Sequence, residues 1–154
     1  KLLMNYQRYP DIKLITEQHV PAEQPINDAE EITANLLTAN PDKDSELHFA
    51  AWGEPAIGAA KALAEAGRDE VIVTGVDGNE QAVQMIKDGS CLKATVKQNF
   101  EGMAEIVCQQ MKKYYAGETI EKGEMYAPAE LITQENASNS MNFPGGPDES
   151  GSFG

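Results

Sequence analysis

The stretch Val71-Ile-Val-Thr-Gly-Val-Asp-Gly-Asn79 decides the fold class. Its first four residues are mostly β-branched and do not alternate with polar residues, which is typical of a strand buried on both faces of a parallel sheet. Gly78 and Asn79 then indicate a tight turn and the N-cap of a helix. A buried strand that turns directly into a helix begins a βαβ unit, so this stretch predicts an α/β protein.

Similar units lie on both sides of this stretch. Strands are expected at 13–17, 47–51 and 93–97, and each is followed by a helical pattern. The strand starts at 13, 47, 71 and 93 are 34, 24 and 22 residues apart, which suits right-handed crossovers in a parallel sheet. One more extended segment is expected at 125–133.

Length and charge limit the functional classes. The chain has 154 residues, enough for one domain, and a formal net charge of −13. Such a surface repels phosphate groups, so no nucleic-acid partner and no anionic membrane surface is expected. The chain opens with a helix-like pattern at 1–9 that does not begin with Met, and we expect a mature or truncated piece of a longer protein.

No catalytic or metal centre is expected. Cys91 precedes a strand and Cys108 lies in the helix after it, too far apart for a disulfide, so two free thiols are predicted. His19 and His48 have no metal-ligand partners at useful spacing. No serine or cysteine stands in a nucleophile motif, and no cofactor motif is present, so the sequence predicts a protein that is not an enzyme.

The candidate site lies where the strands end. In open parallel sheets, ligands bind beyond the carboxyl ends of the strands, and four polar or aromatic residues are expected there: Trp52, Glu54, Asp77 and Gln98. Carboxylates and amides form directional hydrogen bonds to hydroxyl groups, and an aromatic ring can cover a C–H face. This set favours a neutral, polyhydroxylated ligand.

Each residue also has a structural explanation. Asp77 could hold its turn or cap the next helix. Trp52, the single tryptophan, could belong to the core, and Gln98 could be an ordinary polar residue at a strand end. From the residues alone, both explanations stay open.

Five stretches resemble the type 1 periplasmic sugar-binding proteins, which include the ribose- and galactose-binding branch. They are Phe49-Ala-Ala-Trp-Gly-Glu-Pro-Ala-Ile-Gly-Ala59, Val71–Asn79, Met85-Ile-Lys-Asp-Gly89, Ala94-Thr-Val-Lys-Gln98 and Pro128-Ala-Glu-Leu-Ile-Thr-Gln-Glu-Asn136. The resemblance covers about residues 6 to 137 and the second half of the family's two-lobed chain. It implies an incomplete three-layer, parallel-sheet α/β lobe.

The resemblance also implies roles for individual residues. The residues that match Asp77 and Gln98 hydrogen-bond the sugar in that family. The sequence departs from the ribose branch at Trp52, where Asn is common, and at Gly53, where Asp is common. These departures argue against a ribose-like ligand and suggest that Trp52 stacks on the ligand instead.

The resemblance divides the chain into three parts. Residues 1–98 with 127–136 would form the second lobe, 99–126 would cross to the first lobe, and 137–154 would be a flexible tail. The crossing segment has apolar residues at helical spacing: Met103, Val107, Met111 and Tyr114. Without a first lobe this face lacks its partner, so we expect self-association or pairing with the missing first lobe.

The expected function is therefore extracytoplasmic, in the periplasm: binding of a sugar-like solute for delivery to a membrane ABC permease. The alternative is the effector-binding core of a LacI-type transcription regulator, which shares this fold. An enzyme with a flavodoxin-like fold ranks third.

Overall fold

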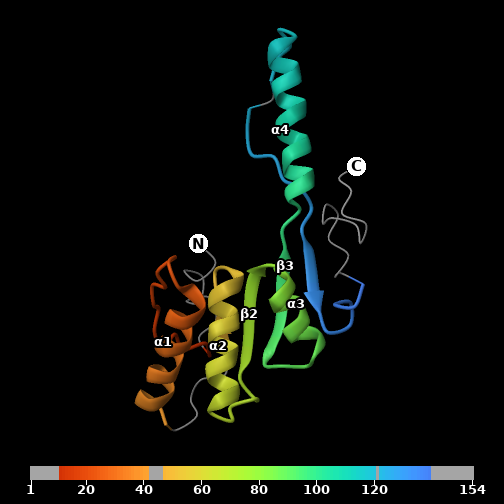
Figure 1. Ribbon diagram of the computed structural model, residues 1–154. Coiled ribbons are helices and arrows are strands. Elements are labelled where there is room, and N and C mark those ends of the chain that lie inside the picture. Colours follow the sequence, from red (N-terminus) through yellow and green to blue (C-terminus); the bar gives the residue numbers. More distant parts are fainter. Residues whose placement is uncertain (1–10, 42–46, 121, 140–154) are drawn as a thin grey trace.

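The computed structural model describes residues 11–41, 47–120 and 122–139, and it confirms the α/β class. Its sheet has the strand order β1-β2-β3-β4. Figure 1 labels the two central strands, β2 and β3. The strands are β1 (Leu47–Phe49), β2 (Ile72–Asp77), β3 (Leu92–Lys97) and β4 (Glu130–Thr133). The first three pair in parallel, as predicted, and β4 pairs antiparallel with β3.

In the described part of the chain, four helices accompany the sheet: α1 (Pro25–Ala39), α2 (Gly53–Glu65), α3 (Glu80–Lys87) and α4 (Phe100–Tyr115). Local chemistry explains two of their starts. The Asn79 side chain accepts a hydrogen bond from the Ala82 N–H at 2.9 Å, so the predicted cap of α3 is confirmed. Asn99 caps α4 in the same way, through the Gly102 N–H.

The core lies between one face of the sheet and the helices α2 and α3. It includes Ile57 and Leu63 from α2, Val83 and Ile86 from α3, and sheet residues such as Val73, Leu92 and Ile132, all at most 1% exposed. α2 and α3 contact each other as well as the strands, so they cover the same face. α1 packs on α2 and forms the outer part of this helical layer.

The opposite face of the sheet is more exposed. Leu47, Phe49 and Ile72 alternate with the buried sheet positions and are 42–60% exposed, and Leu131 of β4 is 59% exposed. Parallel sheets normally carry helices on both faces. Of the three layers predicted for the lobe, the described residues therefore form two: the sheet and one layer of helices.

Three sequence-based expectations differ from the structure. The strand predicted at 13–17 is wrong, because these residues form no ladder, and Leu14 and Ile15 are about 40% exposed. The last strand occupies only Glu130–Thr133 of the extended segment expected at 125–133. Ala137, the first residue of the expected tail, is fully buried. The expected helix at 1–9 and the tail from 140 lie outside the described residues.

α4 projects away from the sheet and the other helices (Figure 1). None of its residues is buried, and it packs against no other described helix or strand. The chain returns from it to β4. The assignment of 99–126 to a crossing between lobes stays a prediction. Over the described ranges, no helix is long and apolar enough to cross a membrane.

Candidate ligand-binding edge of the sheet

A register shift aligns the ends of β2 and β3. Val73 pairs with Leu92, but Thr74 pairs with Ala94, so one residue of β3 is skipped between them. Such an irregularity re-aims the residues that follow it. As a result, Asp77 at the end of β2 lies beside Lys97, the last residue of β3, and next to Gln98.

Asp77 and Gln98 form a hydrogen-bonded pair. The Gln98 amide Nε2 donates to Asp77 Oδ1, and both side chains are partly buried. Asp77 has a φ of 89°, a region that residues other than glycine rarely occupy and that Asp tolerates better than most. Positive-φ residues of this kind often occur at ligand sites.

The turn after Asp77 is held closely against β3. Gly78 has a φ of 67°, and a Cβ atom there would lie 2.7 Å from the Lys97 Cα, so only glycine fits. The Gly78 N–H donates to the Thr95 hydroxyl at 3.2 Å, and Thr95 is 1% exposed. Contacts with β3 therefore hold the turn that follows Asp77 in place.

A second close contact joins the segments that follow β1 and β2. A Cβ atom at Gly53 would lie 2.6 Å from Asn79 Nδ2 and 3.1 Å from the Val76 carbonyl oxygen. The absence of a side chain at Gly53 therefore lets the start of α2 approach the turn after β2. From the sequence alone, Gly53 is only a missing polar group and Asn79 only a helix cap, so this contact is not predicted.

Trp52 and Glu54 lie beside this contact, at the start of α2, and both are half-buried. Trp52 is the N-cap residue of α2 but makes no side-chain capping bond. Within the described part of the chain, hydrogen bonds connect Asp77 with Gln98 but connect neither Trp52 nor Glu54 to that pair. Of the four predicted residues, the structure brings two into contact and places the other two one strand away.

The cysteines are both free, as predicted: Cys91 is buried and Cys108 is exposed. Burial raises the pKa of the Cys91 thiol, which keeps it protonated and unreactive. The described ranges contain no group of three His, Cys, Asp or Glu side chains that could hold a metal ion. The chemistry at this edge is that of hydrogen bonding.

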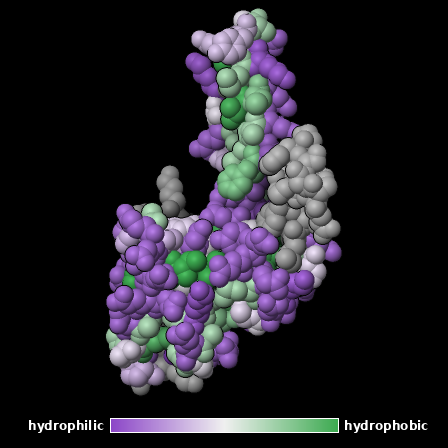
Figure 2. Space-filling view, in the orientation of Figure 1, coloured by the Kyte–Doolittle hydropathy of each residue, from purple (hydrophilic) through white to green (hydrophobic). Residues whose placement is uncertain are grey.

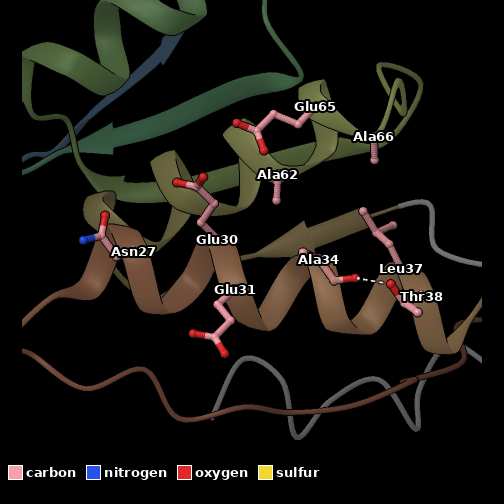
Figure 3. A pocket seen from close by; sticks show the side chains of 9 residues that line it. All are labelled: Asn27, Glu30, Glu31, Ala34, Leu37, Thr38, Ala62, Glu65 and Ala66. Atoms are coloured by element: carbon pink, nitrogen blue, oxygen red, sulfur yellow. Dashed lines mark hydrogen bonds between the residues drawn. The ribbon is translucent and has the colours of Figure 1, made fainter.

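A hollow of about 650 Å³ lies elsewhere, between α1 and α2 (Figure 3). Its lining residues are Asn27, Glu30, Glu31, Ala34, Leu37, Thr38, Ala62, Glu65 and Ala66. The lining contains three carboxylates and no basic side chain, and it is formed by helices rather than by strand ends. We therefore place the candidate site at the sheet edge and not in this hollow.

A parallel sheet with a carboxylate–amide pair at its strand ends, beside a half-buried tryptophan, is typical of one side of a small-molecule binding cleft. Comparison with known families identifies the class more closely. The family model of the periplasmic binding protein domain matches residues 1–119. The chain belongs to this family.

Its relatives are binding proteins of importers. The ribose import binding protein of Bacillus subtilis is 35% identical over 104 residues, which are 68% of this chain and 32% of the relative. The D-apiose import binding protein of Actinobacillus succinogenes is 29% identical over 88% of this chain and 43% of its own length. The chain thus spans about a third to less than half of these relatives.

Solved structures give the same result. An ABC sugar transporter subunit from Rhodobacter sphaeroides superposes with a TM-score of 0.80 at 31% identity, over 88% of this chain and 49% of that one. A solute-binding protein from Agrobacterium vitis with bound allitol has a TM-score of 0.81 at 28% identity, over 90% and 49%. These similarities confirm the resemblance and favour solute import over the LacI-type alternative.

Proposed function

We propose that this chain forms one side of a binding site for a sugar or sugar alcohol, and that the protein containing it delivers the solute to an ABC importer. The observation that supports the site is the Asp77–Gln98 pair at the strand ends. Membership of the periplasmic binding protein family implies an extracytoplasmic location. The names of the relatives support a binding role rather than a catalytic one.

Each residue has a distinct role in this proposal. The Asp77 carboxylate accepts one bond from Gln98 and has further lone pairs for ligand hydroxyls. Gln98 retains its amide oxygen as an acceptor. Trp52 covers a C–H face of the ligand, and Glu54 adds a carboxylate at the edge of the site. The hydrogen bond from Gln98 orients the Asp77 carboxylate before the ligand arrives.

Binding by this chain alone should be weak. Small-molecule sites bury most of their ligand's surface, and the described residues offer only one side of such a site. The expected dissociation constant is therefore millimolar, a range in which amide chemical shifts in NMR spectra report binding well.

The test is a titration of the 154-residue chain with D-apiose and with allitol, followed by NMR. Asp77→Asn is the informative variant, because Asn tolerates a positive φ and only the charge is lost. A hydrogen bond to a charged group contributes about 1 kcal/mol more free energy than one to a neutral group. The affinity of the variant should therefore fall roughly fivefold. Asp69→Asn is the matched control, since Asp69 is exposed and lies before the amino end of β2.

Two results would contradict the proposal. The first is the absence of shift changes at the strand ends with either ligand. The second is an equal loss of affinity in the Asp77 and Asp69 variants, which would place the ligand away from the Asp77–Gln98 pair.

A further inference from the structure

A buried hydroxyl group on β3 holds the turn that follows Asp77. The Gly78 N–H donates to Thr95 Oγ1, and both residues are buried. Asp77 is the last residue of β2 that pairs with β3, so the Gly78 N–H lies beyond the ladder of strand hydrogen bonds. A buried N–H needs an acceptor, and Thr95 supplies one from within the neighbouring strand.

Core packing alone does not explain a threonine at position 95. The face of the molecule seen in Figure 2 is mostly hydrophilic over the helices and the sheet, but Thr95 lies inside and is 1% exposed. Its partner on β4 is Ile132, which is fully buried. Valine has the shape of threonine and would fill this place without burying an oxygen atom. The bond to Gly78 therefore accounts for the hydroxyl group.

The same turn also lies against Lys97. A Cβ atom at Gly78 would be 2.7 Å from the Lys97 Cβ and 3.1 Å from its Cγ, so the stem of Lys97 occupies the space that a side chain at 78 would need. Thr95 and Lys97 are two residues apart and therefore lie on one face of β3. The turn thus contacts two side chains of the same strand.

Asp77 is fixed to β3 on two sides. Its carboxylate accepts the hydrogen bond from Gln98, and the residue after it is bonded to Thr95. Its φ of 89° is a conformation that residues other than glycine keep only where their surroundings enforce it. Rotation about the N–Cα bond moves the Cβ atom and the following residue together, so the bond that holds Gly78 also restrains the direction of the Asp77 side chain.

We propose that Thr95 is a positioning residue of the ligand site. Through its bond to Gly78, it holds Asp77 in the conformation that directs the carboxylate toward Gln98 and the ligand. This inference rests on the proposed function, because that function assigns the Asp77–Gln98 pair to a ligand. Thr95 is buried beneath the turn and acts only through Asp77.

The first test compares the affinities of variants for allitol by NMR titration of the 154-residue chain. Thr95→Val removes the acceptor and should weaken binding roughly fivefold, because a misdirected carboxylate loses its charged hydrogen bonds to the ligand. Thr95→Ser keeps the hydroxyl and should restore the affinity. Thr33→Val is the control, because Thr33 is also buried but lies on α1, which packs on α2 and on none of the described strands.

A double variant separates positioning from a general loss of packing. Asp77→Gly removes the carboxylate and still adopts the positive φ. If Thr95 acts through that carboxylate, Thr95→Val should cause no further loss of affinity in the Asp77→Gly background. Circular dichroism shows whether each variant is folded. If Thr95→Val does not fold, Thr95→Ala and Thr95→Ser give the same comparison, since they differ only in the hydroxyl.

A measurement without ligand distinguishes this inference from the proposed function. The NMR signals of the Gln98 side-chain amide report its bond to Asp77, and Thr95→Val should move them toward those of a free glutamine amide, whereas Thr33→Val should not. If the native chain binds neither D-apiose nor allitol, the proposed function fails, and these signals still decide whether Thr95 directs Asp77. Native affinity in Thr95→Val, unchanged Gln98 signals, or an undiminished effect in the Asp77→Gly background would each overturn the proposal.

Discussion

Replacing Gly58 with alanine tests how closely α1 and α2 pack. A Cβ atom at Gly58 would lie 2.1 Å from the Ile26 carbonyl oxygen, 3.0 Å from the Ala29 Cβ and 3.0 Å from the Glu30 backbone nitrogen. All three atoms belong to α1, and two are backbone atoms that cannot rotate away. Contacts under 3.0 Å are essentially never observed for Cβ atoms, so the helices must separate by at least 3.0 − 2.1 = 0.9 Å.

Two opposing terms determine the size of the effect. Alanine favours a helix over glycine by about 1 kcal/mol, which would stabilise α2. Forcing an extra methyl group into a packed contact costs about 1–3 kcal/mol, and the cost should lie at the upper end because backbone must move. We therefore expect a net loss of about 1–2 kcal/mol in the free energy of unfolding.

Urea denaturation followed by circular dichroism measures this loss. With a slope of about 2 kcal/mol per molar urea, the midpoint should fall by about 0.5–1 M while the slope stays unchanged. Ala34→Gly is the control, because Ala34 is exposed in the middle of α1 and the substitution reports the propensity term alone. A midpoint for Gly58→Ala that equals or exceeds the native one would refute the close packing of α1 and α2.

Three further outcomes follow from buried polar and titratable groups. With a thiol reagent such as DTNB, the exposed Cys108 should react quickly in the native chain and the buried Cys91 only after unfolding. Thr95→Val removes the acceptor of the Gly78 N–H and should lower the free energy of unfolding by about 1–3 kcal/mol in urea titrations. Burial lowers the pKa of His48 below its ordinary 6.5. The unfolded chain therefore binds more protons than the folded one just below pH 6.5, so stability should fall as the pH drops through that value. His48→Gln should remove this slope, which urea midpoints at pH 7 and pH 5.5 would show.

The parts of the fold that are decided locally could be predicted from the sequence. The β-branched residues that begin at Val71 and the capping residue Asn79 each act within a few residues of chain, and the structure contains the expected strand and helix. The strand expected at 13–17 did not form, because a strand also needs a neighbour in the sheet, and pairing is not visible in one segment. The antiparallel direction of β4 depends on the path of the chain between α4 and the sheet. The periodicity of apolar residues in the sequence carries no information on that path.

In the candidate site, too, some features could be predicted from the sequence and others depend on packing between distant segments. That Asp77 and Gln98 lie at neighbouring strand ends follows from strand order, and it could be predicted. Their hydrogen bond depends on the register shift after Val73: with uniform pairing from Val73 and Leu92, Asp77 would oppose Val96. A shift of one residue leaves no mark in the sequence. The positive φ of Asp77 and the contact at Gly53 likewise result from close packing between segments that are distant along the chain.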